Sequence, residues 1–449
     1  MHLHSLSKYS LTTCSIRCDY PKIVSRRSQP EREDITKKVP SMTDTQLWQV
    51  CYWLLMTVAT YTSFRYFRDL GDITQAVMTV TRKKMLFAIR HEYQMLTVSL
   101  ISLGAATGIA FGFDAGWGSS TAILISVNGL FLGFPYIWIH YGLRNQQASA
   151  TYYSIEEAQD FVRPEDSVIV LVNNGEARAH PDYHIKRPHL AGTPDGLGGD
   201  DIIMTYCCLT HLGLGFKPEI EGKKQNLTVL AQHGNNLIMR DAERGEPIQQ
   251  MYGSRDIDGR FSDKSMQQWP TFRMTFRGYQ KAYPQGTVFL NKIKPFKKSP
   301  LLFLLDNVVE AVFLWGTVPH HTNESLLFDT IDVKDDRLKM KDQVWGFNIS
   351  DDVVAYTQEY VQQQGGVINT NVGNRNVVVA WDDSHESLGV FYNDTGAPVD
   401  AINIFGESNG HTLERVETVK AGAYWCVWAN YFPETDLNRE AQLNLAQAS

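Results

Sequence analysis

Cysteine is scarce in this sequence, and its few positions follow no regular spacing. Six cysteines occur among 449 residues: Cys14, Cys18, Cys51, Cys207, Cys208 and Cys426. Six cysteines at such irregular spacing exclude a fold that is held together by a disulfide framework. Adjacent cysteines are also poorly placed to pair with each other. We therefore expect Cys207 and Cys208 to matter through thiol reactivity or metal binding.

Basic residues do not outnumber acidic residues in this sequence. Forty-nine acidic residues outnumber 42 basic ones, and the net charge is −7. Proteins that bind nucleic acid neutralise phosphates with clustered cations, so we expect no nucleic-acid partner. Residues 1–41 are polar and basic and lack the apolar core of a secretory signal, which predicts a disordered tail. An organelle-targeting segment is the alternative there, and residues 441–449 are expected to form a second short tail.

Charge is nearly absent from three long apolar runs in the first third of the chain. They cover residues 45–64, 93–113 and 121–143, and each is about as long as a membrane-spanning helix requires. Small residues in the second run (Gly104, Ala105, Ala106 and Gly108) suit close helix packing in lipid. The short connector at 113–120 predicts a hairpin of the second and third runs. We predict a transmembrane region over 42–150, with buried core helices as the alternative.

The loop at 65–91 is rich in basic residues, which the positive-inside rule places in the cytoplasm. Two further crossings would then return the C-terminal domain to the same side. The basic N-terminal tail argues the opposite, and a lumenal domain would fit four glycosylation sequons at Asn226, Asn323, Asn348 and Asn393. We expect an integral membrane protein with its soluble domain on the cytoplasmic face, a lumenal placement being the alternative.

After Tyr153 the sequence changes to short β-branched runs separated by Gly, Asn, Asp and Pro. Such runs at 167–172, 201–206 and 376–381 predict strands. Helical signals are few: a capping box at 154–161 and a segment at 350–364. The sequence predicts a β-rich α+β domain over residues 151–440.

One pattern occurs twice within this domain. The runs at 168–180 and 201–208 are echoed at 344–356 and 376–383, with Asp382 and Asp383 in place of Cys207 and Cys208. A duplicated half-domain would explain this, with copies at 151–300 and 340–440. Chance similarity between strand-turn-strand patterns is the alternative.

The densest group of chemically active side chains lies between His180 and Met239. A predicted strand ends at Cys207, loops on either side carry histidines, and the next predicted strand carries a histidine and a methionine. The predicted metal ligands are His184, His189, Cys207, His211, His233 and Met239. Thiolate, imidazole and thioether together favour copper, and cysteine with histidine alone favours zinc, although the spacing matches no standard zinc signature. A buried core cysteine and hydrogen-bonded structural histidines are the alternative.

Several motifs carry a family resemblance. They include Asn174-Gly-Glu-Ala-Arg-Ala-His-Pro181, Thr205-Tyr-Cys207, Asn236-Leu-Ile-Met-Arg-Asp241 and the ending Trp428–Leu437. From about Tyr153 to Leu437 the chain resembles domain-of-unknown-function family 3179.

The family pattern continues with a loop histidine and then Thr-Tyr-Cys-Pro-Leu-Cys, which the resemblance aligns with His189 and Cys207. In this chain Cys208 replaces the proline and Thr210 the second cysteine. The resemblance therefore implies a site near Cys207 but argues against a dithiol couple, which needs both sulfurs.

These observations lead to three functional hypotheses. The first is a membrane-anchored, copper-dependent oxidoreductase acting on a hydrophobic small molecule, with Cys207 and His189 as catalytic residues and membrane lipid as its surroundings. The second is a non-catalytic metal-binding or scaffold module at a membrane. The third is a metal-independent enzyme whose Cys207 thiolate is activated by His189 or His211. The oligomeric state is not predicted.

Overall fold

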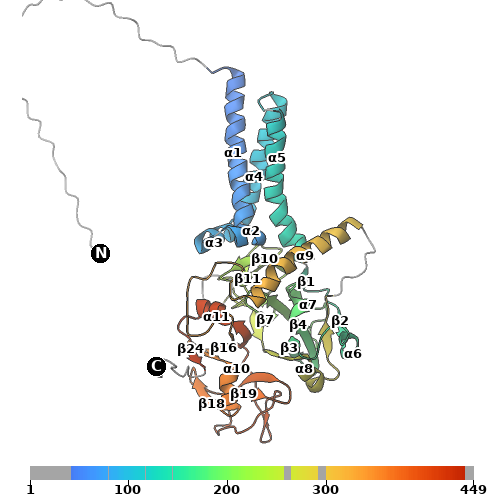
Figure 1. Ribbon diagram of the computed structural model, residues 1–449, viewed down its shortest axis with the longest axis vertical. Coiled ribbons are helices and arrows are strands. Elements are labelled where there is room, and N and C mark those ends of the chain that lie inside the picture. The colour runs from blue at the N-terminus through green and yellow to red at the C-terminus, as the bar shows by residue number, and fades with distance from the viewer. Residues whose placement is uncertain are drawn as a thin grey trace, which may run out of the picture. The chain divides into compact units, whose positions relative to one another are not determined.

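The computed structural model describes residues 42–439 apart from 79, 117, 144, 257–263 and 292–299. The tails predicted at 1–41 and 441–449 lie outside the described residues. The described chain begins with helices and continues into a β-rich domain with short helices (Figure 1). This order agrees with the predicted succession of a helical region and a β-rich α+β domain.

Three long helices run side by side in the first third: α1 (Asp44–Leu70), α4 (Glu92–Gly112) and α5 (Gly118–Ile137), which continues as the short π-helix η1 (Trp138–Gly142) (Figure 1). Within the described residues, α4 and the segment Gly118–His140 are long and apolar enough to cross a membrane. They coincide with the predicted runs at 93–113 and 121–143. The predicted run at 45–64 also forms a helix, α1, which is 27 residues long but carries more polar side chains.

Hydroxyl and amide side chains join the long helices. Tyr52 Oη lies 2.9 Å from Thr121 Oγ1, and Ser63 Oγ donates to Asn128 Oδ1 over 2.7 Å. Such interhelical hydrogen bonds are common between helices packed in lipid. Of the four small residues predicted to pack, Ala106 is fully buried in a cluster with Tyr52 and Met56 of α1. A Cβ added at Gly104 or Gly108 would meet no described atom within 4 Å, so these two glycines do not pack closely within the described structure.

Two short helices, α2 (Asp72–Val77) and α3 (Arg82–Arg90), connect α1 to α4 at the end nearest the β-rich domain. Met85 and Ile89 of α3 belong to one buried cluster with residues of strands β10 (Leu227–His233) and β11 (Asn236–Asp241). Arg240 of β11 also forms a buried ion pair with Glu92. The basic loop and the β-rich domain therefore lie on the same side of the long helices.

A first series of elements begins with the hairpin β3 (Ser167–Asn173) and β4 (Glu176–Pro181). It continues through α7 (Asp182–Ile185), β5 (Leu190–Ala191) and a second hairpin, β6 (Ile203–Cys207) and β7 (Leu212–Lys217). It ends with β14 (Thr271–Thr275), α8 (Phe276–Ala282) and β15 (Thr287–Phe289). The strands lie in the order β14-β3-β4-β15, with β15 parallel to β4.

A second series repeats this order. Its members are β16 (Gln343–Ile349), β17 (Asp352–Tyr356), α10 (Gln358–Gln363), β18 (Val367–Val372), β19 (Arg375–Asp382), β20 (Ser387–Tyr392), β23 (Lys420–Tyr424), α11 (Trp425–Tyr431) and β24 (Asp436–Asn438). The strands lie in the order β23-β16-β17-β24, again with the last strand parallel. The helix predicted at 350–364 is thus wrong over its first half. The β-branched pair Val353-Val354 belongs to strand β17, and the helix begins only after the Thr357 cap.

The two series exchange strand contacts. Strand β20 of the second pairs with β14 of the first at Ser387 and Met274. On the other side, the backbone N–H of Tyr424 in β23 donates to the Thr210 carbonyl oxygen, just before β7, over 2.9 Å. Strands β10, β11 and β12 (Pro247–Gln249) form a separate sheet inserted between β7 and β14. The remaining short elements are β1 (Asn145–Gln146), β2 (Tyr152–Ser154), α6 (Ile155–Ala158), β8 (Glu219–Ile220), β9 (Lys223–Lys224), β13 (Gln267–Trp269), β21 (Glu407–Ser408) and β22 (His411–Thr412).

Helix α9 (Pro300–Thr322) was not predicted, and it lies at the end of the β-rich domain from which the long helices project (Figure 1). It is held there by Arg187, whose side chain is 1% exposed. The guanidinium donates to Asp306 over 2.7 Å, to Glu310 over 2.6 Å and to the Gly142 carbonyl oxygen over 2.9 Å. One buried cation thus joins α9 to the end of η1.

Replacing Arg187 by leucine is expected to loosen α9. The substitution leaves Asp306 and Glu310 without their shared cation, and breaking a largely buried pair costs about 3 kcal/mol of unfolding free energy. Denaturant unfolding of the full chain in detergent micelles measures this loss, and amide hydrogen exchange should rise along α9. Arg375→Leu, which removes the exposed pair with Asp394, is the control and should cost less than about 1 kcal/mol. Equal losses for both variants would contradict the assigned role.

Candidate functional site

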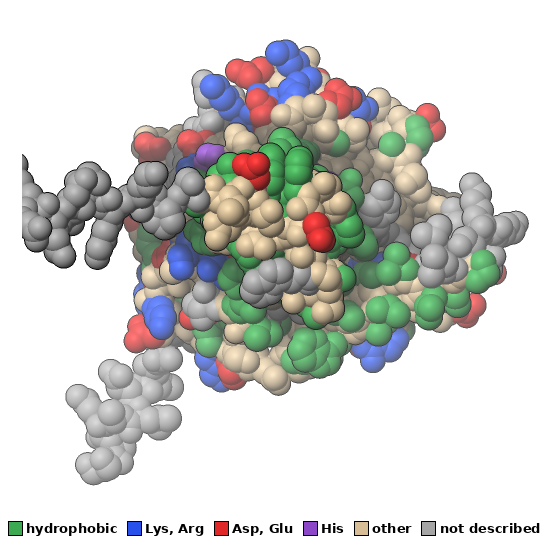
Figure 2. All heavy atoms as spheres, turned by 90° about the horizontal axis from the view of Figure 1, so that it is seen from above, with side chains coloured by type: hydrophobic (Ala, Val, Ile, Leu, Met, Phe, Trp, Pro, Cys, Tyr) green, Lys and Arg blue, Asp and Glu red, His purple; other side chains and the backbone are tan. Residues whose placement is uncertain are grey.

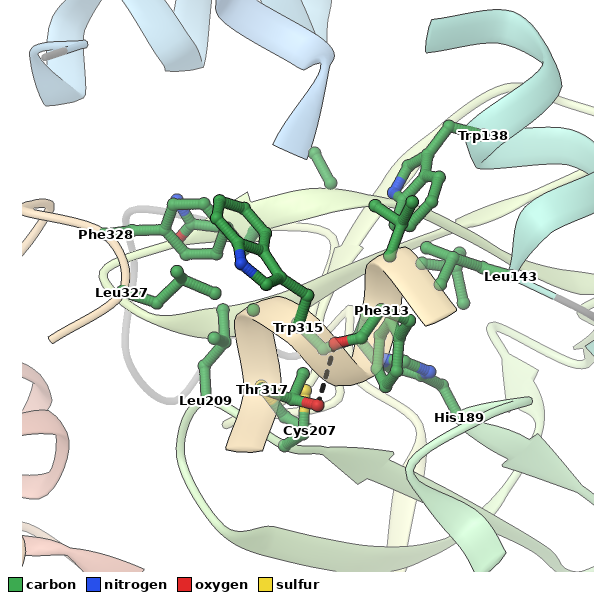
Figure 3. A pocket seen from close by; sticks show the side chains of 17 residues that line it. Trp138, Leu143, His189, Cys207, Leu209, Phe313, Trp315, Thr317, Leu327 and Phe328 are labelled. Carbon is green, nitrogen blue, oxygen red and sulfur yellow. Dashed lines mark hydrogen bonds between the residues drawn. The ribbon is translucent and has the colours of Figure 1, made fainter. Parts of the chain in front are cut away.

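A cavity lies beneath α9, between that helix, the end of the long helices and strands β6, β10 and β11. Its empty space is about 650 Å³, including its open mouth. Trp138 and Leu143 line it from one side, Phe313 and Trp315 from α9, and Leu327 and Phe328 from the segment that follows (Figure 3). Its walls are mostly aliphatic and aromatic, which is typical of small-molecule sites.

His189 is one of the few polar residues in the cavity wall. It follows α7 in a left-handed conformation with φ of 72°, which residues other than glycine rarely adopt. The side chain is 6% exposed, and its ring meets Phe313 edge-on with centroids 5.7 Å apart. Burial, together with the nearby Arg187 charge, lowers the pKa of His189 to about 3, so the imidazole is neutral at physiological pH. Its Nδ1 is buried and accepts or donates no hydrogen bond within the described structure.

Cys207, the last residue of β6, lines the same cavity together with Cys208 (Figure 3). Its sulfur lies 3.7 Å from the Asn235 carbonyl oxygen, and burial raises the pKa of the thiol. Thr210, which replaces the second cysteine of the family pattern, donates to the same carbonyl oxygen over 2.7 Å. The Cys207 thiol and the Thr210 hydroxyl thus share one acceptor, at the two positions where the family pattern has two cysteines.

The other predicted ligands do not line this cavity. His184 Nε2 lies 3.5 Å from the Phe161 carbonyl oxygen, His233 Nδ1 lies 3.5 Å from the Tyr431 hydroxyl, and Met239 is fully buried in the core. Across the described ranges, no group of three His, Cys, Asp or Glu side chains is placed to hold a metal ion. Of the six predicted ligands, Cys207 and His189 line this cavity. Copper and zinc binding stay predictions.

His211 belongs to a different polar cluster. Its Nε2 lies 3.1 Å from the Asp182 carboxylate and its Nδ1 lies 3.1 Å from the Gly422 carbonyl oxygen. Both nitrogens of the ring therefore face oxygen acceptors. Burial alone would raise the pKa of Asp182, but Arg273 and His211 more than offset it and hold that pKa below its ordinary value. The cluster joins α7 and β14 of the first series to β23 of the second.

Sequence reasoning missed the residues that α9 contributes. The run Pro300–Thr322 carries buried Val309 and Phe313 four residues apart, a spacing typical of a helix packed on a core. That periodicity could have indicated a further helix. It could not have indicated that the helix covers Cys207 and His189.

Stability is expected to fall as the pH drops from about 6.5 towards 4. His180 and His189 have pKa values of about 3, and His320 about 4, all lowered mainly by burial. Between these values and the unfolded value of about 6.5, only the unfolded chain takes up the protons, so each histidine contributes up to about 1.4 kcal/mol per pH unit.

Thermal unfolding midpoints of the full chain across this pH range measure the effect. His189→Leu should make the dependence shallower, whereas substitution of the exposed His411 by leucine should leave it as it is. An unchanged slope in His189→Leu would contradict the neutral, buried state of this imidazole.

With this geometry in place, the comparisons with known proteins identify a family. No curated protein and no solved structure matches the chain. Residues 134–435 match the family described as "Protein of unknown function (DUF3179)". The match covers more than half of the chain, includes the cavity and α9, and confirms the resemblance seen in the motifs. The chain therefore belongs to the DUF3179 family.

Proposed function

We propose that this protein is anchored in a membrane and binds a hydrophobic small molecule in the cavity beneath α9. The observation that carries the proposal is the buried Nδ1 of His189, which finds no partner in the described structure although it lies in an otherwise apolar wall. Leaving a buried polar atom unsatisfied costs free energy. The other polar side chains of the wall are bonded: Gln232 to Gln75 and Thr317 to the Phe313 carbonyl. A ligand with one polar group and an apolar body would satisfy His189.

The anchor in this proposal comprises α4, α5 and α1. Asn128 and Ser63 make α1 part of the same helical bundle, and its 27 residues exceed the length that a span needs. Lys83, Lys84 and Arg90 are exposed on α3, on the side of the β-rich domain. Figure 2, seen from the side of the helices, has Lys and Arg side chains gathered around the rim. The positive-inside rule then favours a cytoplasmic β-rich domain.

The proposal also includes a duplication of the half-domain. The two series share the order of their elements and the pairing of their strands. The helices that precede the last strand of each series, α8 and α11, also end in the same conformation. The C-cap of α8, Tyr283, has φ and ψ of −134° and 67°, and the C-cap of α11, Phe432, has −133° and 65°. Each cap precedes a proline. Such agreement supports one ancestral unit, of which the first copy kept a cysteine at the end of strand β6.

A dodecanol that carries a photoreactive diazirine is expected to label the cavity. In the full chain reconstituted in lipid nanodiscs, cross-links should map to Phe313 and Trp138. Ala231→Phe should abolish them, because it fills space beside the buried wall. Ala401→Phe, which adds the same ring at an exposed site, is the matched control.

His189→Leu tests the polar contact within the same experiment. Loss of one hydrogen bond should weaken dodecanol binding about fivefold, which corresponds to about 1 kcal/mol. An analogue without the hydroxyl should bind the variant and the original chain equally. Labelling that persists in Ala231→Phe, or an equal loss for both probes, would overturn the proposal.

A copper-dependent oxidation is the second candidate function. It is favoured by the meeting of a thiol, Cys207, and an imidazole nitrogen, His189, in one cavity, since soft thiolate ligands select copper(I). Metal binding would have to displace the thiol proton. The metal-independent alternative has less support, because burial raises the pKa of Cys207 and lowers that of His189, which opposes the thiolate–imidazolium pair that such an enzyme needs.

Elemental analysis distinguishes the second candidate from ligand binding alone. If copper is held here, the full chain isolated from copper-supplemented cells should carry the metal, and Cys207→Ser should lose it. Cys426→Ser removes a buried cysteine that does not line the cavity and should keep the metal. Metal-free chain that still takes up the dodecanol probe would rule out copper and leave the binding proposal intact.

A further inference from the structure

We infer that α9 lies at the membrane surface with one face in lipid, so that the cavity opens towards the bilayer and takes its ligand from it. This rests on the proposed membrane anchoring and extends it, because it specifies the ligand as a molecule that partitions into lipid. The inference comes from the exposed face of α9, from the height at which α9 is held, and from one residue that belongs to both that face and the cavity.

The exposed face of α9 is mostly apolar, with Asn307 and Thr322 as exposed polar residues. We call its apolar part the outer stripe, and it consists of Leu304, Val308, Ala311, Trp315 and Val318. These positions follow one another at intervals of four and three residues, so they share one side of the helix. Leu304 is 61% exposed and Trp315 is 69% exposed. Large exposed apolar patches mark sites of contact with a membrane or a partner.

The two carboxylates of α9 are turned the other way. Asp306 and Glu310 bind the buried Arg187, while Val309, Phe313 and Thr317 are buried against the domain. A helix at the surface of a soluble domain normally directs its charges to water and its apolar side to the core. In α9 both sides are mostly apolar, and its two carboxylates bind a buried cation of the domain. This distribution suits a helix whose outer side meets hydrocarbon.

The height of α9 relative to the long helices favours a bilayer as the occupant. Arg187 ties α9 to the carbonyl of Gly142, where η1 ends. Close to that end, Arg240 binds Glu92 at the start of α4 and lies 3.1 Å from His140 Nε2. Charged groups of this kind belong outside the hydrocarbon core. They mark the level at which the spans end, and α9 starts close to that level and runs obliquely down across the β-rich domain (Figure 1).

The outer stripe therefore continues the apolar surface of the spans. In the view from the side of the helices, hydrophobic side chains cover both the helices and part of the domain surface beside them (Figure 2). Interfacial helices bury their apolar side about 5–10 Å into the boundary between headgroups and acyl chains, and tryptophan is enriched at that depth. Trp315 is the residue of the stripe that meets this description.

Trp315 also connects the stripe to the cavity. Its side chain lines the cavity next to Phe313, at the roof formed by α9 (Figure 3). A side chain that is mostly exposed and also lines a cavity lies at the mouth. If the outer stripe is in lipid, the mouth faces lipid, and a hydrophobic ligand passes from the bilayer to His189 without crossing water.

Fluorescence quenching by lipids tests the inference directly. Leu304, Val308 and Trp315 are replaced by cysteine one at a time in the full chain, labelled with the environment-sensitive fluorophore NBD and reconstituted into phosphatidylcholine nanodiscs with or without doxyl-labelled lipid. Ile101, exposed on α4, is the control for a span, and Asp394, exposed on the β-rich domain, is the control for water. The unsubstituted chain, treated alike, measures labelling of the native cysteines.

Quenching at the three α9 positions as strong as at Ile101, with none at Asp394, is the expected result. If Ile101 is quenched and the α9 positions are not, the helices span the membrane but α9 does not touch it, and the inference fails alone. Quenching at none of the positions would overturn both the inference and the proposed anchoring. A further measurement uses detergent micelles without lipid. If the NBD fluorescence at the α9 positions changes there as the chain concentration rises, the outer stripe contacts a second copy of the chain instead of lipid.

Discussion

The buried guanidinium of Arg187 is the contact on which the cavity depends. It reaches the end of the long helices through Gly142 and α9 through Asp306 and Glu310. His189 follows only two residues later, in a left-handed backbone conformation that turns it into the cavity wall. A planar cation with five donors can satisfy a carbonyl and two carboxylates at once. One side chain thereby fixes the roof of the cavity and positions the loop that supplies its polar group.

The two series of strands carry different residues at corresponding positions, and these residues have different contacts. At the end of β6 stands Cys207, whose thiol lines a cavity. At the corresponding end of β19 stands Asp382, whose carboxylate accepts hydrogen bonds from the backbone of Ser384 and Ile404 and lies 2.8 Å from His385 Nδ1. The Asp382 carboxylate thus stabilises the turn that follows β19. A thiol makes weaker hydrogen bonds, and the space beside Cys207 is covered by an inserted sheet and by α9 instead.

Much of the architecture follows from local sequence, whereas the assembly of the site does not. Apolar runs without charge locate α4 and α5, and the β-branched runs locate β3, β6 and β19. The capping box at Ser154 and Glu157 forms, but the helix it opens is only four residues long. Motif matching placed His189 and Cys207 in one site. Spacing along the chain could not separate them from His211, because one of the two partners of that histidine, Gly422, lies 211 residues further on. The roof helix was overlooked because an apolar run interrupted by Asp306 and Glu310 resembles neither a span nor a polar surface helix.

The exchange of strand contacts between the two series has a consequence for biosynthesis. Strand β14 pairs with both β3 and β20, and β7 meets β23 near the end of the domain. Neither half can complete its hydrogen bonding until the other has left the ribosome, and contacts of such long sequence separation form slowly. Helices α1, α4 and α5 precede the β-rich domain in the chain, and the backbone hydrogen bonds within each helix are local. These apolar helices are thus synthesised while the β-rich domain is still an incomplete chain, whose open strand edges need protection from aggregation during that interval.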